Sequence, residues 1–448
     1  NSVNQSSHSI KMHVVIVVFV LLLTASSATA EITPARTVTT SSTIRNKKKD
    51  QQQQQPWDHL LYDPNPFPSI AELDASPTLS NDIQDVLNRV VGTGNNNNGV
   101  IIQRYKPQPG WLWQQWFGTV LYNSWPNALL NMAWALLFCV FCRHMTHGDF
   151  QVWKNVVVAD VADQHPFIAK LAIADKIWTT LMSLTNFLLT FFVGQSYAFW
   201  RSFYSVGRSI QGRLNDIQLL LATHAARDEA TGQYTPEAYT FLQTTAQQLR
   251  LFHLLHWAAN AKRFRVLLTQ QGWNQMVSHG IVSPSEHERL LRLDLPPTSR
   301  HYAVLQATMI NITQKAVRSP NIIITSSSSN LEKLVMAEFC KLRGVCGSVA
   351  DMADGRMPLA YAHFVQILVD TFLVATPIAK YASLGIFSVL MIGILTLFFH
   401  GLLILAKVFL DPLDNEDYCE GCTYLDLPVL IRESNASSKR WIDGAAII

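Results

Sequence analysis

Charged residues are scarce in this sequence. Only 15% of its 448 residues are Asp, Glu, Lys or Arg, whereas about 25% is usual in soluble proteins. Hydrophobic residues make up 48% of the chain, so the deficit of charge points to a protein that lies in a lipid bilayer. The formal net charge of +3 is too small to argue for a nucleic-acid partner.

Cysteine and catalytic motifs are also sparse. The six cysteines show no disulfide framework, and Cys419 and Cys422 form a single CxxC without a second ligand pair at zinc spacing. The sequence contains no GxSxG, no phosphate-binding loop and no dinucleotide fingerprint. It therefore gives no support to an enzyme.

The first 30 residues are similar to a signal peptide. Lys11 and His13 flank Met12 and precede the apolar run Val14–Leu23, and Ala28-Thr29-Ala30 offers a small-residue cleavage site. A further membrane helix is the alternative. The apolar run is shorter than the ~20 residues that a span needs, so the signal peptide is preferred.

Residues 31–56 are rich in Thr, Ser, Lys and Arg and poor in acids. That composition is typical either of a plastid transit segment or of a disordered linker, and both interpretations stay open here. Residues 57–110 are treated as an N-terminal extension, in which Asn95 to Asn98 indicate a flexible loop.

Four later segments are long and apolar enough to cross a membrane. The sequence therefore predicts an all-α membrane protein in which four transmembrane helices are joined to a helical soluble domain. The expected spans are about residues 126–142, 177–200, 359–379 and 381–406.

Residues 201–357 should form the soluble domain, because their apolar residues recur at helical spacing. Ser283, Pro284 and Glu286 predict a helix start with a capping box. Only Ile322–Ile324 indicates extended structure.

Four polar side chains need an explanation. Asp370 and His400 fall inside expected spans, where charge is costly, so they should face the interior of the bundle or another subunit. His253 and His256 are spaced to share a metal ion. Packing within a soluble helix is the preferred interpretation, because the sequence indicates no third ligand.

The second expected span carries an unusual stripe. Phe187 and Phe191 lie one helical turn apart, with Ser183 one turn before them, and Asn186 and Thr190 form the neighbouring row. Aromatic stripes commonly pack inside a helical bundle. The polar residues beside this one allow the alternative that it faces a pore.

Four motifs, in order along the chain, resemble the bestrophin family of anion channels. The resemblance covers residues 111–426 and implies a homopentamer in which five copies of the second span surround one pore, with residues 427–448 as a C-terminal tail. The motifs are WRSFY at the end of the second span, GIVSPSEHERLLRLDLP, LAYAHFVQILVDTFL after Met357-Pro358, and KVFLDPLDNEDY.

The resemblance also implies two constrictions. Phe187 and Phe191 would line a narrow hydrophobic neck that begins near Ser183. A second constriction deep in the soluble part would involve Met357 and Pro358. Asn186 and Thr190 would face the pore or a neighbouring helix.

In animal bestrophins the loop after the fourth span binds calcium. The resemblance thus makes Asp411, Asp414, Glu416 and Asp417 candidate Ca²⁺ ligands, since carboxylates are hard oxygen donors. Asn415, Tyr418 and Cys419 interrupt the acidic run, so a solvated acidic loop without calcium is the alternative. No cofactor is required for passive conduction.

The expected function is passive conduction of chloride, with bicarbonate as a second ion, by a homopentamer embedded in membrane lipid. The alternative is a non-conducting scaffold that holds a soluble partner such as a carbonic anhydrase. The N-terminal composition favours a plastid, thylakoid location, with a secretory or plasma membrane as the alternative. The glycosylation sequons at Asn311 and Asn435 would carry sugar in that second case.

Overall fold

The computed structural model describes residues 67–91, 101–102, 110, 119–148, 150–153, 166–324, 328–414 and 425–445. Within these residues all regular structure is helical apart from two isolated β-bridges, Ala225–Ile323 and Arg227–Tyr234. The all-α class is therefore confirmed for the described part of the chain. The signal-like and transit-like segments, residues 1–30 and 31–56, lie outside the described residues.

The described helices fall into two compact units. Residues 120–193 and 359–404 belong to the first unit, and residues 67–119, 194–358 and 405–448 belong to the second. Helix α7, Pro166–His224, contributes residues to both.

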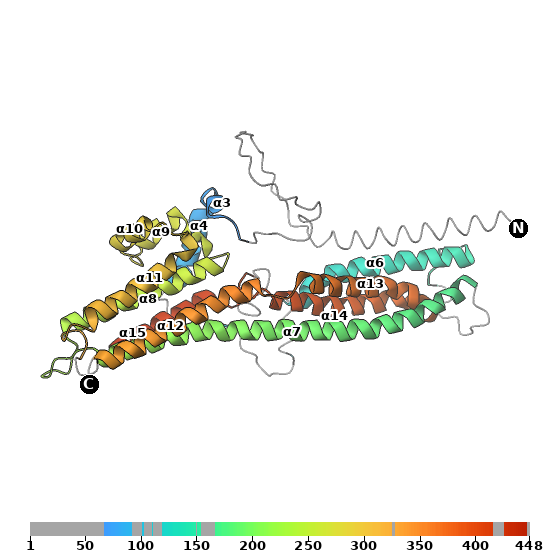
Figure 1. Ribbon diagram of the computed structural model, residues 1–448. Coiled ribbons are helices and arrows are strands. Elements are labelled where there is room, and N and C mark those ends of the chain that lie inside the picture. Colours follow the sequence, from blue (N-terminus) through green and yellow to red (C-terminus); the bar gives the residue numbers. More distant parts are fainter. Residues whose placement is uncertain are drawn as a thin grey trace, which may run out of the picture. The chain divides into compact units, whose positions relative to one another are not determined.

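Four helices in the described residues are long and apolar enough to span a membrane, as the sequence predicts. They are α6 (Val120–His147), α7, α13 (Leu359–Leu384) and α14 (Phe387–Phe409). Figure 1 shows α6, α13 and α14 running side by side. Helix α6 begins six residues before the expected first span, so that Pro126 lies inside the helix.

A glycine sets the boundary between α13 and α14. Gly385 has a φ of 53°, a left-handed conformation that glycine adopts without steric cost. Its N–H donates to the carbonyl of Tyr381 at 2.9 Å and closes the last turn of α13. Tyr381 therefore belongs to the third membrane helix, whereas the sequence pattern places it at the start of the fourth.

Polar side chains join the membrane helices. Asn131 of α6 donates to the Thr396 hydroxyl of α14 at 3.0 Å. The indole N–H of Trp134, also on α6, donates to the carbonyl of Val374 in α13 at 3.2 Å. Hydrogen bonds of this kind hold helices together in lipid, where apolar contacts alone give little preference for a partner.

The two ionisable residues expected to avoid lipid are half-buried and have polar neighbours. Asp370 accepts a hydrogen bond from Gln366 of the same helix at 2.6 Å. His400 lies 3.3 Å from the side-chain nitrogen of Asn127 on α6. Both side chains thus exchange hydrogen bonds within the bundle, which lowers the cost of placing them in a span.

The second unit is a helical domain with one large apolar core. Helices α8 and α11 lie side by side in it (Figure 1). Ser283 caps α10 as predicted, because its Oγ accepts from the N–H of Glu286 at 3.2 Å. The predicted capping box is incomplete, because the Glu286 carboxylate pairs with Arg289 at 2.6 Å instead of reaching back to the N–H of Ser283. The helices are α8 (Pro236–Asn260), α9 (Gln270–Ser278), α10 (Pro284–Arg292), α11 (Arg300–Asn311) and α12 (Ser328–Asp354), with the short segments η3 (Arg265–Leu268), η4 (Pro297–Ser299) and η5 (Ile312–Ala316).

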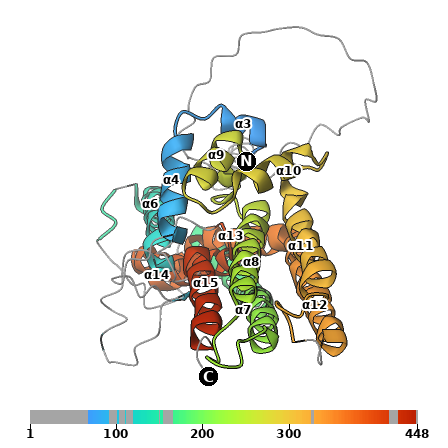
Figure 2. The same ribbon diagram turned by 90° about the vertical axis from the view of Figure 1, so that its left-hand side faces the viewer.

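Both flanks of the expected channel domain add helices to this unit. They are α3 (Ile70–Asp74) and α4 (Leu79–Val91) before it and α15 (Leu427–Gly444) after it. Helix α15 packs against α4 and α8 (Figure 2). The C-terminal tail thus includes a helix that buries one face in the core.

Candidate functional site

One side of α7 packs against its own unit. Trp178, Leu189 and Phe192 are buried on this side. The indole N–H of Trp178 donates to the Thr376 hydroxyl at 3.0 Å, and its ring stacks on Phe372 with centroids 5.0 Å apart. These contacts fix the rotation of α7 about its own axis.

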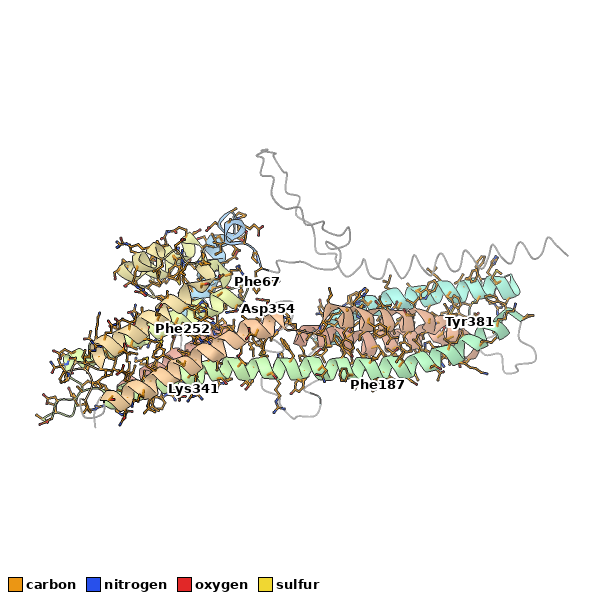
Figure 3. The ribbon with its side chains drawn as sticks, viewed as in Figure 1. Phe67, Phe187, Phe252, Lys341, Asp354 and Tyr381 are labelled. Carbon is orange, nitrogen blue, oxygen red and sulfur yellow. The ribbon has the colours of Figure 1, made fainter. Side chains whose placement is uncertain are left out.

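The opposite side of α7 is open. Phe187 follows Trp178 by nine residues, about two and a half helical turns, and so points away from the packed side. It is 69% exposed, and Figure 3 shows it on the edge of α7 that faces away from α13 and α14. Thr180 and Ser183 lie on this same side and are also exposed.

The remaining predicted neck residues flank this open side. Asn186 and Thr190 are exposed along one flank, and Phe191, which is 50% exposed, lies along the other. Tyr361 of α13 meets the Phe191 ring edge-on, with centroids 6.2 Å apart and an interplanar angle of 88°. The structure therefore brings all five residues onto one exposed half of α7, while their roles in a pore stay predictions.

Such a surface is poorly suited to lipid. Hydroxyl and amide groups that face hydrocarbon lose hydrogen bonds to water without replacement. Ser183 recovers one bond by donating to the carbonyl of Thr179 at 3.3 Å, but Asn186 is exposed. The open side of α7 is thus suited to a water-filled space or to another polar helix.

The predicted second constriction lies in the connection between α12 and α13. Met357 is half-buried and Pro358 is exposed. Pro358 directly precedes the first residue of α13. The part of Met357 in a second narrow ring stays a prediction.

Two of the four candidate calcium ligands are described. Asp414 accepts the backbone N–H of Lys262 at 2.7 Å, and Asp411 lies 3.5 Å from the guanidinium of Arg356. Burial, together with the neighbouring Asp411 carboxylate, raises the pKa of Asp414 to about 6. Glu416 and Asp417 lie outside the described residues.

These two carboxylates do not build a calcium site by themselves. Ca²⁺ takes six to eight oxygen ligands, and the described residues contain no group of three or more His, Cys, Asp or Glu placed to hold a metal. Both carboxylates also have partners within the chain. Calcium binding therefore stays a prediction that depends on the remainder of the loop.

The two histidines of the HLLHW motif are packed in the core of the second unit, with a third beside them. His253, His256 and His301 are buried, and the rings of His256 and His301 lie 5.3 Å apart. Nε2 of His253 accepts from the indole N–H of Trp257 at 2.9 Å, which requires its proton on Nδ1. Desolvation lowers the pKa of His253 to about 3 and that of His301 to about 4, and it lowers the pKa of His256 well below 6.5.

Sequence reasoning missed Tyr361 and His301. Tyr361 lies three residues after Pro358, but only the packing of α13 on α7 shows that its ring contacts Phe191. His301 lies far from the HLLHW motif in the chain. Its place beside His256 follows from the pairing of α8 with α11, for which the sequence gives no local signal.

We expect replacement of Asp414 by Asn to stabilise the protein in calcium-free buffer at pH 8. Because the pKa of Asp414 is raised in the folded state, ionisation of this carboxyl above about pH 6 lowers the free energy of unfolding. This destabilisation disappears as the pH falls toward 4. The gain should be about 1–3 kcal/mol at pH 8 and close to zero at pH 4, measured by thermal unfolding in EGTA.

The exposed Asp294 provides the control, since Asp294→Asn should change stability little at either pH.

Adding calcium then tests the prediction that Asp414 is a calcium ligand. If Asp414 binds the ion, calcium raises the Tm of the wild-type chain more than that of Asp414→Asn, and equal shifts in both proteins would contradict the prediction.

The histidine cluster predicts acid sensitivity. The pKa values of His253, His256 and His301 are lowered in the folded state. The neutral histidines therefore contribute fully to the free energy of unfolding above about pH 6.5, and this contribution is lost as the pH falls toward 4. His256→Leu should flatten the fall of Tm between pH 7 and 5. His279→Leu, at an exposed histidine, should leave the slope unchanged, and identical slopes for both variants would contradict this account.

Comparison with known proteins supports the resemblance. The family model described as "Bestrophin, RFP-TM, chloride channel" matches residues 162–425. Comparison with curated proteins gives no significant match.

Two solved structures of a bacterial bestrophin homologue from Klebsiella pneumoniae share the fold. One carries a tryptophan-to-alanine mutation and aligns with a TM-score of 0.52 at 16% identity, covering 73% of this chain and 100% of that one. The other carries a tyrosine-to-alanine mutation and aligns with a TM-score of 0.50 at 13% identity, covering 70% and 97%. Since the matched family region takes in more than half of the sequence, the chain belongs to the bestrophin family.

Proposed function

We propose that five copies of this chain form a passive anion channel whose neck is lined by Phe187 and Phe191. The observation that carries the proposal is the open side of α7, which is polar and aromatic within a span and points away from its own bundle. A ring of five copies would give this side a water-filled space to face. The membership of the chain in a chloride-channel family supports the same assignment.

The chemistry of the neck favours weakly hydrated anions. A narrow ring of phenyl groups excludes bulk water and admits ions that release their hydration at low cost. The edge of a phenyl ring carries partial positive charge, so rings turned edge-on to the axis favour an anion over a cation. Chloride and bicarbonate are both monovalent anions, and we propose that both pass.

Electrical recording in planar bilayers tests this function. We expect anion currents from the purified wild-type protein, and reversal potentials under asymmetric chloride and bicarbonate give the ratio of their permeabilities. The double variant Phe187→Ala, Phe191→Ala should carry at least several-fold more current, because widening an apolar constriction lets water fill it.

Phe398→Ala is a matched control. Phe398 is also an exposed phenylalanine in a membrane helix of the same unit, at 59%, but it lies on α14. Its removal should leave conductance and selectivity unchanged. Absence of anion current from both the wild-type protein and the double neck variant would refute the channel.

We further propose that the protein resides in a plastid membrane, where bicarbonate flux would supply carbon dioxide. The support is the composition of residues 31–56, which is rich in hydroxyl and basic residues. A C-terminal fluorescent fusion expressed in algal cells should overlap with chlorophyll fluorescence. Signal at the cell surface, or sugar on Asn311 or Asn435, would instead assign the protein to the secretory pathway.

A further inference from the structure

The open side of α7 carries a lysine, Lys176, just before the apolar part of the span. Lys176 precedes Phe187 by eleven residues, close to three full helical turns. It therefore lies on the same side as Phe187, about 16 Å along the helix axis. It also lies seven residues before Ser183, so one line of side chains runs from the lysine through the serine to the first phenylalanine.

The nearest described carboxylate has another partner. Asp175 pairs with Lys380 at 2.6 Å, and Lys380 also lies over the ring of Trp178, 4.3 Å from its centroid, on the packed side of α7. Among the described residues, no carboxylate lies within salt-bridge distance of Lys176, whose side chain is exposed. The Asp175–Lys380 pair is thus neutral, and the charge of Lys176 lies on the open side of α7.

We infer that Lys176 forms a ring of positive charge at one mouth of the pore and concentrates anions there before they reach the neck. This inference rests on the proposed channel, because the ring exists only where five α7 helices surround one axis. Five lysines around an aqueous opening raise the local anion concentration and lower that of cations. Phe187 itself lies beyond the screening length of ~8–10 Å at physiological salt. Lys176 therefore raises the anion concentration at the mouth of the pore and has little effect on the electrostatic potential at the neck.

The test compares Lys176→Glu with Lys170→Glu. Lys170 is an exposed lysine of the same helix, six residues earlier and therefore about a third of a turn away from the line. In planar bilayers at low salt, Lys176→Glu should reduce the single-channel anion conductance by about three- to tenfold. At about 1 M salt the difference should largely disappear, because the screening length falls to ~3 Å, and Lys170→Glu should have a much smaller effect.

Charge can also be restored on an assembled channel. A Lys176→Cys variant should lose conductance at low salt, regain it after reaction with a cationic methanethiosulfonate, and lose more after reaction with an anionic one. The wild-type chain treated with the same reagents controls for Cys340, which is exposed. The change in conductance on modification is measured on the same channel before and after the reagent, so it does not depend on how well the variant folds.

The outcomes separate the two proposals. Anion currents that are equally salt-dependent in the wild-type protein, Lys176→Glu and the modified Lys176→Cys variant would overturn the charged ring and leave the channel intact. Absence of current from the wild-type protein and from the neck variants would overturn the channel and the ring together.

Discussion

The structure depends on the cost of placing polar groups in hydrocarbon. A hydroxyl or amide in lipid has no water to replace a lost hydrogen bond. Between α6 and α14 such groups turn inward, as Asn131 does toward Thr396. On α7 several of them turn outward instead, so a single protomer leaves this constraint unsatisfied. The proposed assembly around an aqueous axis would satisfy it, and oligomerisation and conduction would then follow from one requirement.

The aromatic residues of α7 have two different tasks. Trp178 and Phe192 are buried and fix the helix in its bundle, while Phe187 and Phe191 are left outward. Trp178 and Phe187 are separated by about half a turn, and the consecutive Phe191 and Phe192 by a little over a quarter of a turn. Because helical periodicity alone decides which phenylalanine belongs to which set, the sequence could predict the outward pair once the packed side was known.

Prediction from the sequence succeeded where the signal is local. Four apolar segments and the cap at Ser283 each follow from residues close together in the chain. Failures occurred where distant segments meet. The buried face of α15 and the place of His301 beside His256 depend on partners far away in sequence, and the end of α13 depends on the left-handed conformation of Gly385.

The two outward phenylalanines are held to different degrees. The Phe191 ring rests against Tyr361, whereas Phe187 has 69% of its surface outside its own subunit. Contact with Tyr361 therefore restrains the Phe191 side chain, whereas the more exposed Phe187 can move among its staggered rotamers. Rotamer exchange on an exposed side chain takes picoseconds to nanoseconds. The width of an aperture formed by Phe187 would then fluctuate far faster than any rearrangement of the backbone around it.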